Sequence, residues 1–203
     1  MGIKCLITGI VVVTCLNISA CGGTNSSDNI TNSSTTVSTF QAFDFTATVD
    51  QISGTPSFNV AIGDKLTGKF VYDTTAKDWN VYDTNQGYFH NMNSPSGIQF
   101  QINTLSFVSD INTYYITILN DDSSALPVRD EFEIMATSNQ DSKLNTVLCF
   151  RDFTASAFSS STCNSLPQTL DFNSFTNNYM FITSISGFTG WSIRLLPATL
   201  TKE

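Results

Sequence analysis

Apolar and polar residues alternate along most of the chain after residue 40, which is typical of β-strands that bury one face. Between residues 43 and 49, Phe43, Phe45, Ala47 and Val49 share one face, and only polar residues lie between them. The alternation recurs at residues 58–62 and 66–72, and turn-forming residues separate the three segments. The pattern therefore predicts three short strands at the start of this region.

Seven further segments of the same kind follow at similar intervals. They cover residues 98–102, 105–107, 114–118, 132–136, 147–150, 180–185 and 190–195. No long window has the period of a helix, although residues 170–175 could form one short helical turn. About ten strands predict an all-β domain, either an antiparallel β-sandwich or a closed β-barrel. We favour the sandwich because segments such as 147–150 are apolar on both faces, as central strands are.

The beginning of the chain has the features of an export signal. Lys4 precedes an apolar stretch of about 12 residues, Cys5–Leu16. A membrane-spanning helix needs about 20 apolar residues, so this stretch fits a cleaved signal peptide. The run Leu16-Asn17-Ile18-Ser19-Ala20-Cys21-Gly22 resembles the lipobox of bacterial lipoproteins. That resemblance implies cleavage after Ala20 and a lipid on Cys21; the alternative is an ordinary secretory signal followed by a chance cysteine.

A polar segment separates this signal from the predicted strands. It is rich in Gly, Ser, Thr and Asn and has almost nothing to bury, which predicts a disordered tether. We therefore expect a signal peptide at 1–20, a lipidated cysteine and tether at 21–39, and one all-β domain at 40–203. Stable anchoring takes two acyl chains, so the predicted location is the cell envelope. No aspartate follows Cys21, which in a Gram-negative cell implies the outer membrane.

Composition and charge exclude one class of partner. The 203 residues include 16 Phe, only 13% are charged, and the net charge is −8. An acidic surface without a basic run repels phosphate backbones, so we expect no nucleic-acid partner. Membrane association is expected through the lipid alone.

The cysteines divide into two groups. Cys5 and Cys15 belong to the signal peptide and Cys21 carries the predicted lipid, which leaves Cys149 and Cys163 in the domain. An even remainder in an exported domain predicts a disulfide between them. It would close a loop of about 15 residues and contribute about 3 kcal/mol. Two unpaired thiols are the alternative.

One local pattern in the domain resembles a known kind of protein. Phe45–Val49 and Val60–Asp73 combine a Gly-Asp turn, a Thr-Gly strand and a strand that ends in Tyr-Asp; Ile118–Asp121 and Asp130–Phe132 continue the likeness. The pattern is similar to a β domain of bacterial exported proteins that is known only as a domain of unknown function, often with a sorting tail. The likeness covers about half of the domain. It implies a β fold and carries no catalytic residue over to this chain.

Catalytic constellations are weak in this sequence. His90 is the only histidine and has no nucleophile motif nearby, which disfavours both a Ser-His-Asp triad and a zinc site. Glycoside hydrolysis needs two carboxylates, and the three glutamates are Glu131, Glu133 and Glu203. The alternation of the strand predicts that Glu133 faces solvent. We therefore favour a non-enzymatic role but leave enzymatic activity open, and we assign no catalytic residue and no cofactor apart from a possible structural calcium ion.

Acidic turns are the best candidates for metal ligands. Calcium takes six to eight oxygen ligands, which loops rich in Asp and Asn supply. One candidate cluster is Asp73, Asp78 and Asp83, and the other is Asp121, Asp122 and Asp130. Asp and Asn are also good turn formers, so a purely structural role is the alternative.

Aromatic residues in the same turn-rich stretch suggest a binding surface. Trp79, Tyr82 and Tyr88 could stack on sugar rings, but for Trp79 we favour a position that caps the core, which is the commoner place for such a ring. We expect a non-enzymatic, lipid-anchored protein whose β-sandwich binds a glycan or protein ligand or has a structural role in the envelope. The alternative is a hydrolase that acts on an envelope polymer or polysaccharide.

Overall fold

The computed structural model describes residues 39–80, 82–90, 92–121, 128–158, 163–184 and 190–203. The predicted signal peptide, Cys21 and nearly all of the tether lie outside the described residues, as does Asp122 of the second acidic cluster. Within the described part of the chain, no helix is long and apolar enough to cross a membrane.

The described residues form ten strands and two single-turn helices, which confirms the all-β prediction. The strands are β1 (Phe40–Ser53), β2 (Lys65–Asp73), β3 (Gln86–Phe89), β4 (Gly97–Ile102), β5 (Leu105–Val108), β6 (Tyr115–Leu119), β7 (Asp130–Thr137), β8 (Leu144–Asp152), β9 (Asn177–Ser184) and β10 (Trp191–Lys202). The short 3-10 helices are η1 (Ile111–Thr113) and η2 (Phe172–Ser174). All strand pairs are antiparallel, in the order β3-β6-β7-β8-β9-β10-β1-β2-β4-β5.

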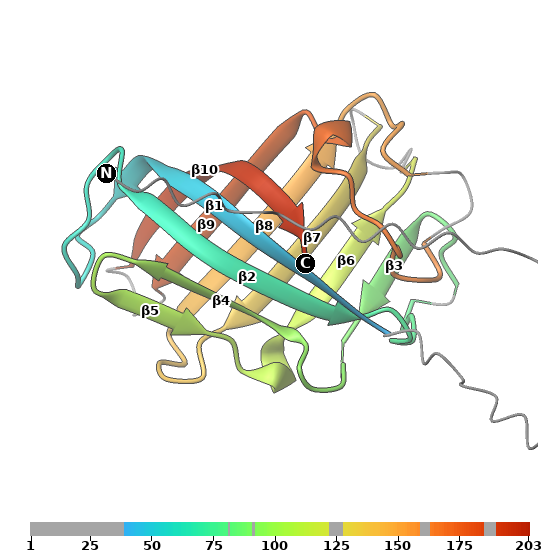
Figure 1. The fold of residues 1–203 in the computed structure, drawn as a ribbon, viewed down its shortest axis with the longest axis horizontal. Helices are drawn as coiled ribbons and strands as arrows, with labels where there is room; N and C mark the ends of the chain where they lie inside the picture. Colours follow the sequence, from blue (N-terminus) through green and yellow to red (C-terminus); the bar gives the residue numbers. More distant parts are fainter. Residues whose placement is uncertain (1–38, 81, 91, 122–127, 159–162, 185–189) are drawn as a thin grey trace, which may run out of the picture. The chain divides into compact units, whose positions relative to one another are not determined.

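The sheet curls back on itself, so that one sheet forms both layers of the domain. In Figure 1, β1, β2, β4 and β5 lie in front of the strands from β6 to β9. The ring of Phe70 on β2 lies 6.3 Å from the rings of both Phe132 on β7 and Phe150 on β8. The two parts bury their inner faces against each other as a sandwich does, although a single curled sheet is also barrel-like.

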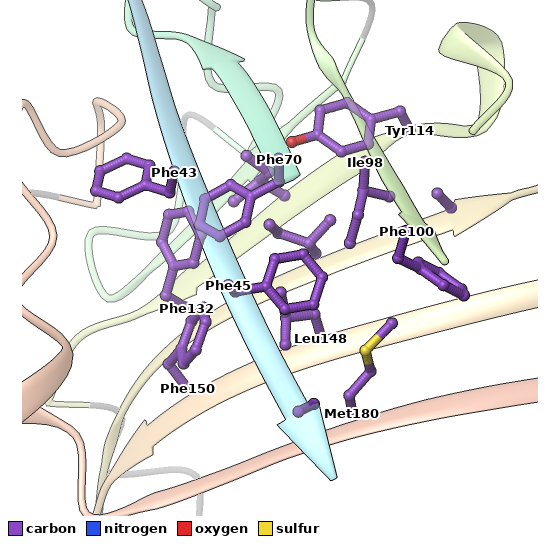
Figure 2. Close-up of a cluster of buried hydrophobic side chains, with 14 of the residues drawn as sticks. Phe43, Phe45, Phe70, Ile98, Phe100, Tyr114, Phe132, Leu148, Phe150 and Met180 are labelled. Atoms are coloured by element: carbon purple, nitrogen blue, oxygen red, sulfur yellow. The ribbon is translucent and has the colours of Figure 1, made fainter. Parts of the chain in front are cut away.

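The core consists of the side chains on these inner faces. Phe43, Phe45, Ala47 and Val49 of β1 are each at most 2% exposed, so the alternation assigned the buried face of this strand correctly. Figure 2 shows Phe70, Phe132 and Phe150 gathered around β1 with aliphatic side chains from the neighbouring strands. Burial of this many aromatic rings provides the main stabilisation of the domain.

The structure departs from the predicted strands at residues 58–62 and in β3, which the alternation did not predict. Residues 58–62 form a loop, in which Ile62 is 70% exposed and Phe58 packs against Trp191. The β1–β2 ladder ends at Thr48 and Lys65, so the last residues of β1 pair with β10 alone and this segment adds no strand beside them. The pairing of β1 with β10 also shifts register opposite Pro197, because proline has no N–H to donate to the ladder.

The predicted Cys149–Cys163 disulfide is contradicted by the structure. Both cysteines are free and buried. Cys163 belongs to the core cluster, whereas Cys149 alternates with the core residues Leu148 and Phe150 of β8 and faces the other side of the sheet. The two thiols therefore lie on different faces, and the spacing along the chain could not reveal this.

Candidate functional site

The candidate site lies on the face of β3, β6, β7, β8 and β9 that points away from the core, here called the outer face. Strand register places its side chains in rows across the sheet. One row contains Tyr115, Met135, Val147 and Phe181, and the next contains Tyr88, Thr117, Glu133, Cys149 and Tyr179. Most of these side chains are half-buried. An outward face with this many aromatic and apolar residues differs from an ordinary solvated face.

Four rings form a continuous aromatic row at the β3 end of the outer face. Ring centroids lie 4.1 Å apart for Trp79 and His90, 5.5 Å for His90 and Tyr88, and 5.2 Å for Tyr88 and Tyr115. The Tyr115 hydroxyl donates to the Sδ atom of Met135 at 2.8 Å. Trp79 remains 58% exposed, so the row presents an open ring to solvent at one end. We call Trp79, His90, Tyr88 and Tyr115 the aromatic row.

Asp78 holds Trp79 in this position. Its Oδ1 atom accepts hydrogen bonds from the backbone N–H groups of Tyr88 at 2.9 Å and Asn80 at 2.8 Å. The backbone N–H of Trp79 donates to the Tyr88 carbonyl at 2.8 Å. Asp78 also forms an isolated β-bridge with Phe89. The loop before β3 is thereby fastened to the edge of that strand. Asp78 was predicted as a metal ligand, and the structure uses it to position the aromatic row.

Two of the three predicted stacking residues come together and the third does not. Trp79 and Tyr88 belong to the aromatic row, whereas Tyr82 is 96% exposed and has no ring contact with another described residue. The favoured prediction that Trp79 caps the core is wrong, because more than half of its surface is exposed. Sequence reasoning missed His90 and Tyr115 as members of the row. One signal could have identified Tyr115: it is an aromatic residue on the face of β6 that the alternation assigns to solvent.

The outer face contains a groove of about 550 Å³ beside the aromatic row. Its lining residues come from five strands and from η1: Tyr88, His90, Asn112, Thr113, Tyr115, Met135, Ala136, Thr137, Asn145, Thr146, Val147 and Thr183. The floor is aromatic near β3 and apolar at Met135 and Val147, and hydroxyl and amide groups lie along it. None of these lining residues is Asp, Glu, Lys or Arg.

A compact polar cluster occupies the neighbouring part of the outer face. Glu131 is buried, and its Oε2 atom accepts from the Nε atoms of Arg129 at 2.8 Å and Arg151 at 2.6 Å. Arg151 also donates through Nη2 to the Tyr179 hydroxyl at 2.7 Å. Glu133 was predicted to face solvent, and it does lie on the outer face, but it is half-buried beside Glu131.

The two carboxyl groups titrate in opposite directions. Burial raises the pKa of Glu133 to about 7, and the negative charge of Glu131 adds to the effect. Burial acts in the same direction on Glu131, but hydrogen bonds from Arg151 and Arg129 outweigh it and lower the pKa of that carboxyl. The proton therefore stays on Glu133, because the guanidinium groups of Arg129 and Arg151 both form ion pairs with Glu131.

Within the described residues, one group of side chains comes close enough to share a metal ion. Glu131, Glu133 and Cys149 each offer a ligand atom, and these atoms lie within 4.8 Å of one another. The adjacent guanidinium groups of Arg129 and Arg151 oppose a cation there. Burial and the charge of Glu131 also raise the pKa of the Cys149 thiol, which keeps it in the protonated form that binds metals poorly.

The acids predicted to bind calcium are not brought together among the described residues. Asp73 is buried, and its oxygens accept from Thr75 and from the Asn93 side chain; these bonds lower its pKa against the opposing effect of burial. Asp83 accepts from the N–H of Asn85. The alternative of turn formation accounts for the contacts of Asp73 with Thr75 and of Asp83 with Asn85, whereas the Asn93 contact ties a more distant loop to the end of β2.

Asp130 and Asp121 of the second cluster meet through a backbone contact. The two carboxylate oxygens of the buried Asp130 accept from the N–H groups of Asp121 and Phe158, both at 2.9 Å. Asp130 thus ties two loops to the start of β7.

No family model, curated protein sequence or solved structure matches this chain.

Proposed function

We propose that this protein is a lipid-anchored envelope protein whose β domain binds a glycan through the aromatic row. The observation that carries the proposal is the open row Trp79–His90–Tyr88–Tyr115, which runs into a groove lined by Thr and Asn side chains. Sugar rings have apolar C–H faces and polar edges, so they match a surface that combines aromatic faces with hydroxyl and amide groups. The structural alternative, an aromatic cap on the core, would have buried these rings.

Ordinary surface stability does not require such a row. A large exposed aromatic side chain loses apolar stabilisation unless a ligand covers it. Trp79 is 58% exposed, yet Asp78 and the Tyr88 backbone hold its loop firmly in place. A rigid exposed ring avoids much of the entropy cost of ordering a binding side chain. This arrangement favours a site that is formed before the ligand arrives.

The test measures retention of the purified full-length protein, in detergent micelles, on a panel of immobilised polysaccharides. Trp79→Ala and Tyr115→Ala should each weaken retention about two- to tenfold, since a stacked ring contributes about 0.5–1.5 kcal/mol. Tyr82→Ala is the matched control, because Tyr82 is more exposed than Trp79 but lies outside the row. Equal losses in all three variants, or losses in none, would reject the aromatic row as the binding site.

The lipid anchor forms the second part of the proposal. Cys21 and the small residues before it support export and lipidation, and the polar tether would hold the domain away from the membrane. Metabolic labelling with an acyl-chain probe should mark the wild-type protein and leave a Cys21→Ala variant unlabelled. Labelling that persists in this variant would show that the anchor assignment is wrong.

A hydrolase is the second candidate, because one observation favours it. Glu133 and Glu131 are two neighbouring carboxyl groups with opposite pKa directions, which is the arrangement of a general acid beside an ionised partner. The two guanidinium groups that bind Glu131 weaken it as a nucleophile. Release of reducing ends from the retained polysaccharide, lost in Glu133→Gln while retention persists, would establish this activity.

A further inference from the structure

Resting on the glycan binding proposed above, we propose that the ligand is an uncharged, extended polysaccharide chain. It crosses the strands of the outer face from Trp79 on the β3 side to Thr183 on β9. The site would then comprise several sugar positions, and the aromatic row would form only the first of them. The groove, its lining chemistry and the surrounding charges support this inference.

The groove is long in the direction that crosses the strands. Its lining runs from Tyr88 on β3 through Tyr115 on β6, Met135 on β7 and Val147 on β8 to Thr183 on β9. Those five strands are consecutive neighbours in the sheet. Neighbouring strands lie about 4.8 Å apart, so four intervals span about 19 Å. This length suits an extended chain of several sugar residues and exceeds what a single sugar would occupy.

The chemistry of the lining changes along this path in a way that suits a polymer. Near β3 the floor consists of aromatic faces, and beyond β6 it continues as the apolar side chains of Met135 and Val147. Along one side, Thr137 and Asn145 form a hydrogen bond of 2.7 Å between Oγ1 and Oδ1. This bond fixes both side chains while leaving the Asn145 amide with a further N–H to offer. An apolar floor with a polar edge matches the faces and hydroxyl edges of a sugar chain.

The charges around the groove select an uncharged ligand. No Asp, Glu, Lys or Arg is among the described lining residues, so no permanent charge there pairs with a carboxylate, phosphate or ammonium group. The nearby guanidinium groups of Arg129 and Arg151 are already engaged by Glu131. The whole chain carries a net charge of −8, which repels anionic polymers at longer range. A neutral polysaccharide encounters neither an unpaired charge nor repulsion.

The test uses the full-length protein and a length series of neutral oligosaccharides, from disaccharide to hexasaccharide, prepared from the polysaccharide that the panel identifies. Affinity should rise with length until the chain fills the groove. Thr183→Val should weaken hexasaccharide binding about three- to tenfold and leave disaccharide binding unchanged, since it removes one hydrogen bond at the far end. Thr67→Val is the matched control, because Thr67 is an exposed threonine of β2 outside this groove.

The outcomes separate the two proposals. If Trp79→Ala abolishes binding but affinity does not depend on length and Thr183→Val has no effect, the aromatic row binds a short glycan and the extended site is refuted. If an anionic polysaccharide of equal length binds as tightly as the neutral one, the inference of an uncharged ligand is wrong. If no glycan binds, or if Trp79→Ala leaves the affinity unchanged, the proposed function itself is refuted.

Discussion

Ionisation of Glu133 should make the domain less stable as the pH rises towards neutrality. The ordinary pKa of this carboxyl is 4.5, and burial together with the charge of Glu131 raises it to about 7 in the folded protein. Below pH 4.5 the group is protonated in both the folded and the unfolded chain. Between these two values only the folded chain retains the proton, so the free energy of unfolding falls as the pH rises. Above pH 7 both states are ionised and the dependence ends.

The size of the effect follows from the same two values. One pKa unit is worth about 1.36 kcal/mol, so the full rise would correspond to about 3 kcal/mol. Glu133 is only half-buried, and solvent screening reduces the effect, so we expect about 1–2 kcal/mol. Glutamine keeps the shape of the protonated acid and cannot ionise. Glu133→Gln should therefore match the wild type at about pH 4 and exceed its stability by about 1–2 kcal/mol at about pH 8.

Urea unfolding across this pH range, followed by fluorescence of the buried Trp191, measures the difference between wild type and variant. Glu131→Gln is the control with the opposite sign, because the Arg151 and Arg129 hydrogen bonds lower the pKa of Glu131 against the effect of burial. The stability that Glu131 contributes is present above its ordinary pKa and is lost as the pH falls, so this variant should be weakened most near neutrality. If the difference in unfolding free energy between the wild type and Glu133→Gln stays constant with pH, the raised pKa of Glu133 is refuted.

Three further predictions test other parts of the structure. Phe70→Ala should cost about 3–5 kcal/mol in urea unfolding, because Phe70 is fully buried between both layers, and Phe70→Leu should cost clearly less; similar small losses would contradict the central role of this ring. Cys149 and Cys163 should both resist a thiol reagent in the native protein and react in urea, since burial raises both pKa values, that of Cys163 to about 11; unreactive sulfurs in urea without reductant would instead reveal a disulfide. Calcium added after chelation should leave the melting temperature unchanged, because oxygens of Asp73 and Asp78 already accept hydrogen bonds from the chain; a rise of several degrees would reverse this conclusion.

The alternation of residues predicted the fold well where strands are long and one face is buried. Phe43 to Val49 shows this, since all four predicted core residues of that segment are buried. It failed at residues 58–62, which alternate equally well but form a loop. Alternation reports which residues could share a face, and it contains no information on whether a segment pairs with the strand beside it. The alternation also did not predict β3, because a strand of four residues is too short to show a clear pattern.

Part of the candidate site could be predicted in the same way. Trp79 and Tyr88 were identified because aromatic residues in a turn-rich stretch are unusual, and the structure places both in the aromatic row. Tyr115 and Tyr179 lie on the outward face of their strands, where an aromatic residue is a signal that sequence reasoning could have used. Glu131 and Glu133 gave a weaker signal, because the pair matters only through the arginines that lie beside it.

The sequence by itself determined the elements: short amphipathic strands, Asp- and Gly-rich turns, and a core of phenylalanine rings. These follow from a period of two residues and from turn chemistry, which are properties of neighbouring residues along the chain. Only the tertiary structure decided the neighbours across strands, because register and the curl of the sheet depend on contacts between distant segments. Register brought Arg151 and Tyr179 to Glu131, and the opposite sides of the sheet separated Cys149 from Cys163. The pairing of the Trp79 loop with the edge of β3 assembled the aromatic row.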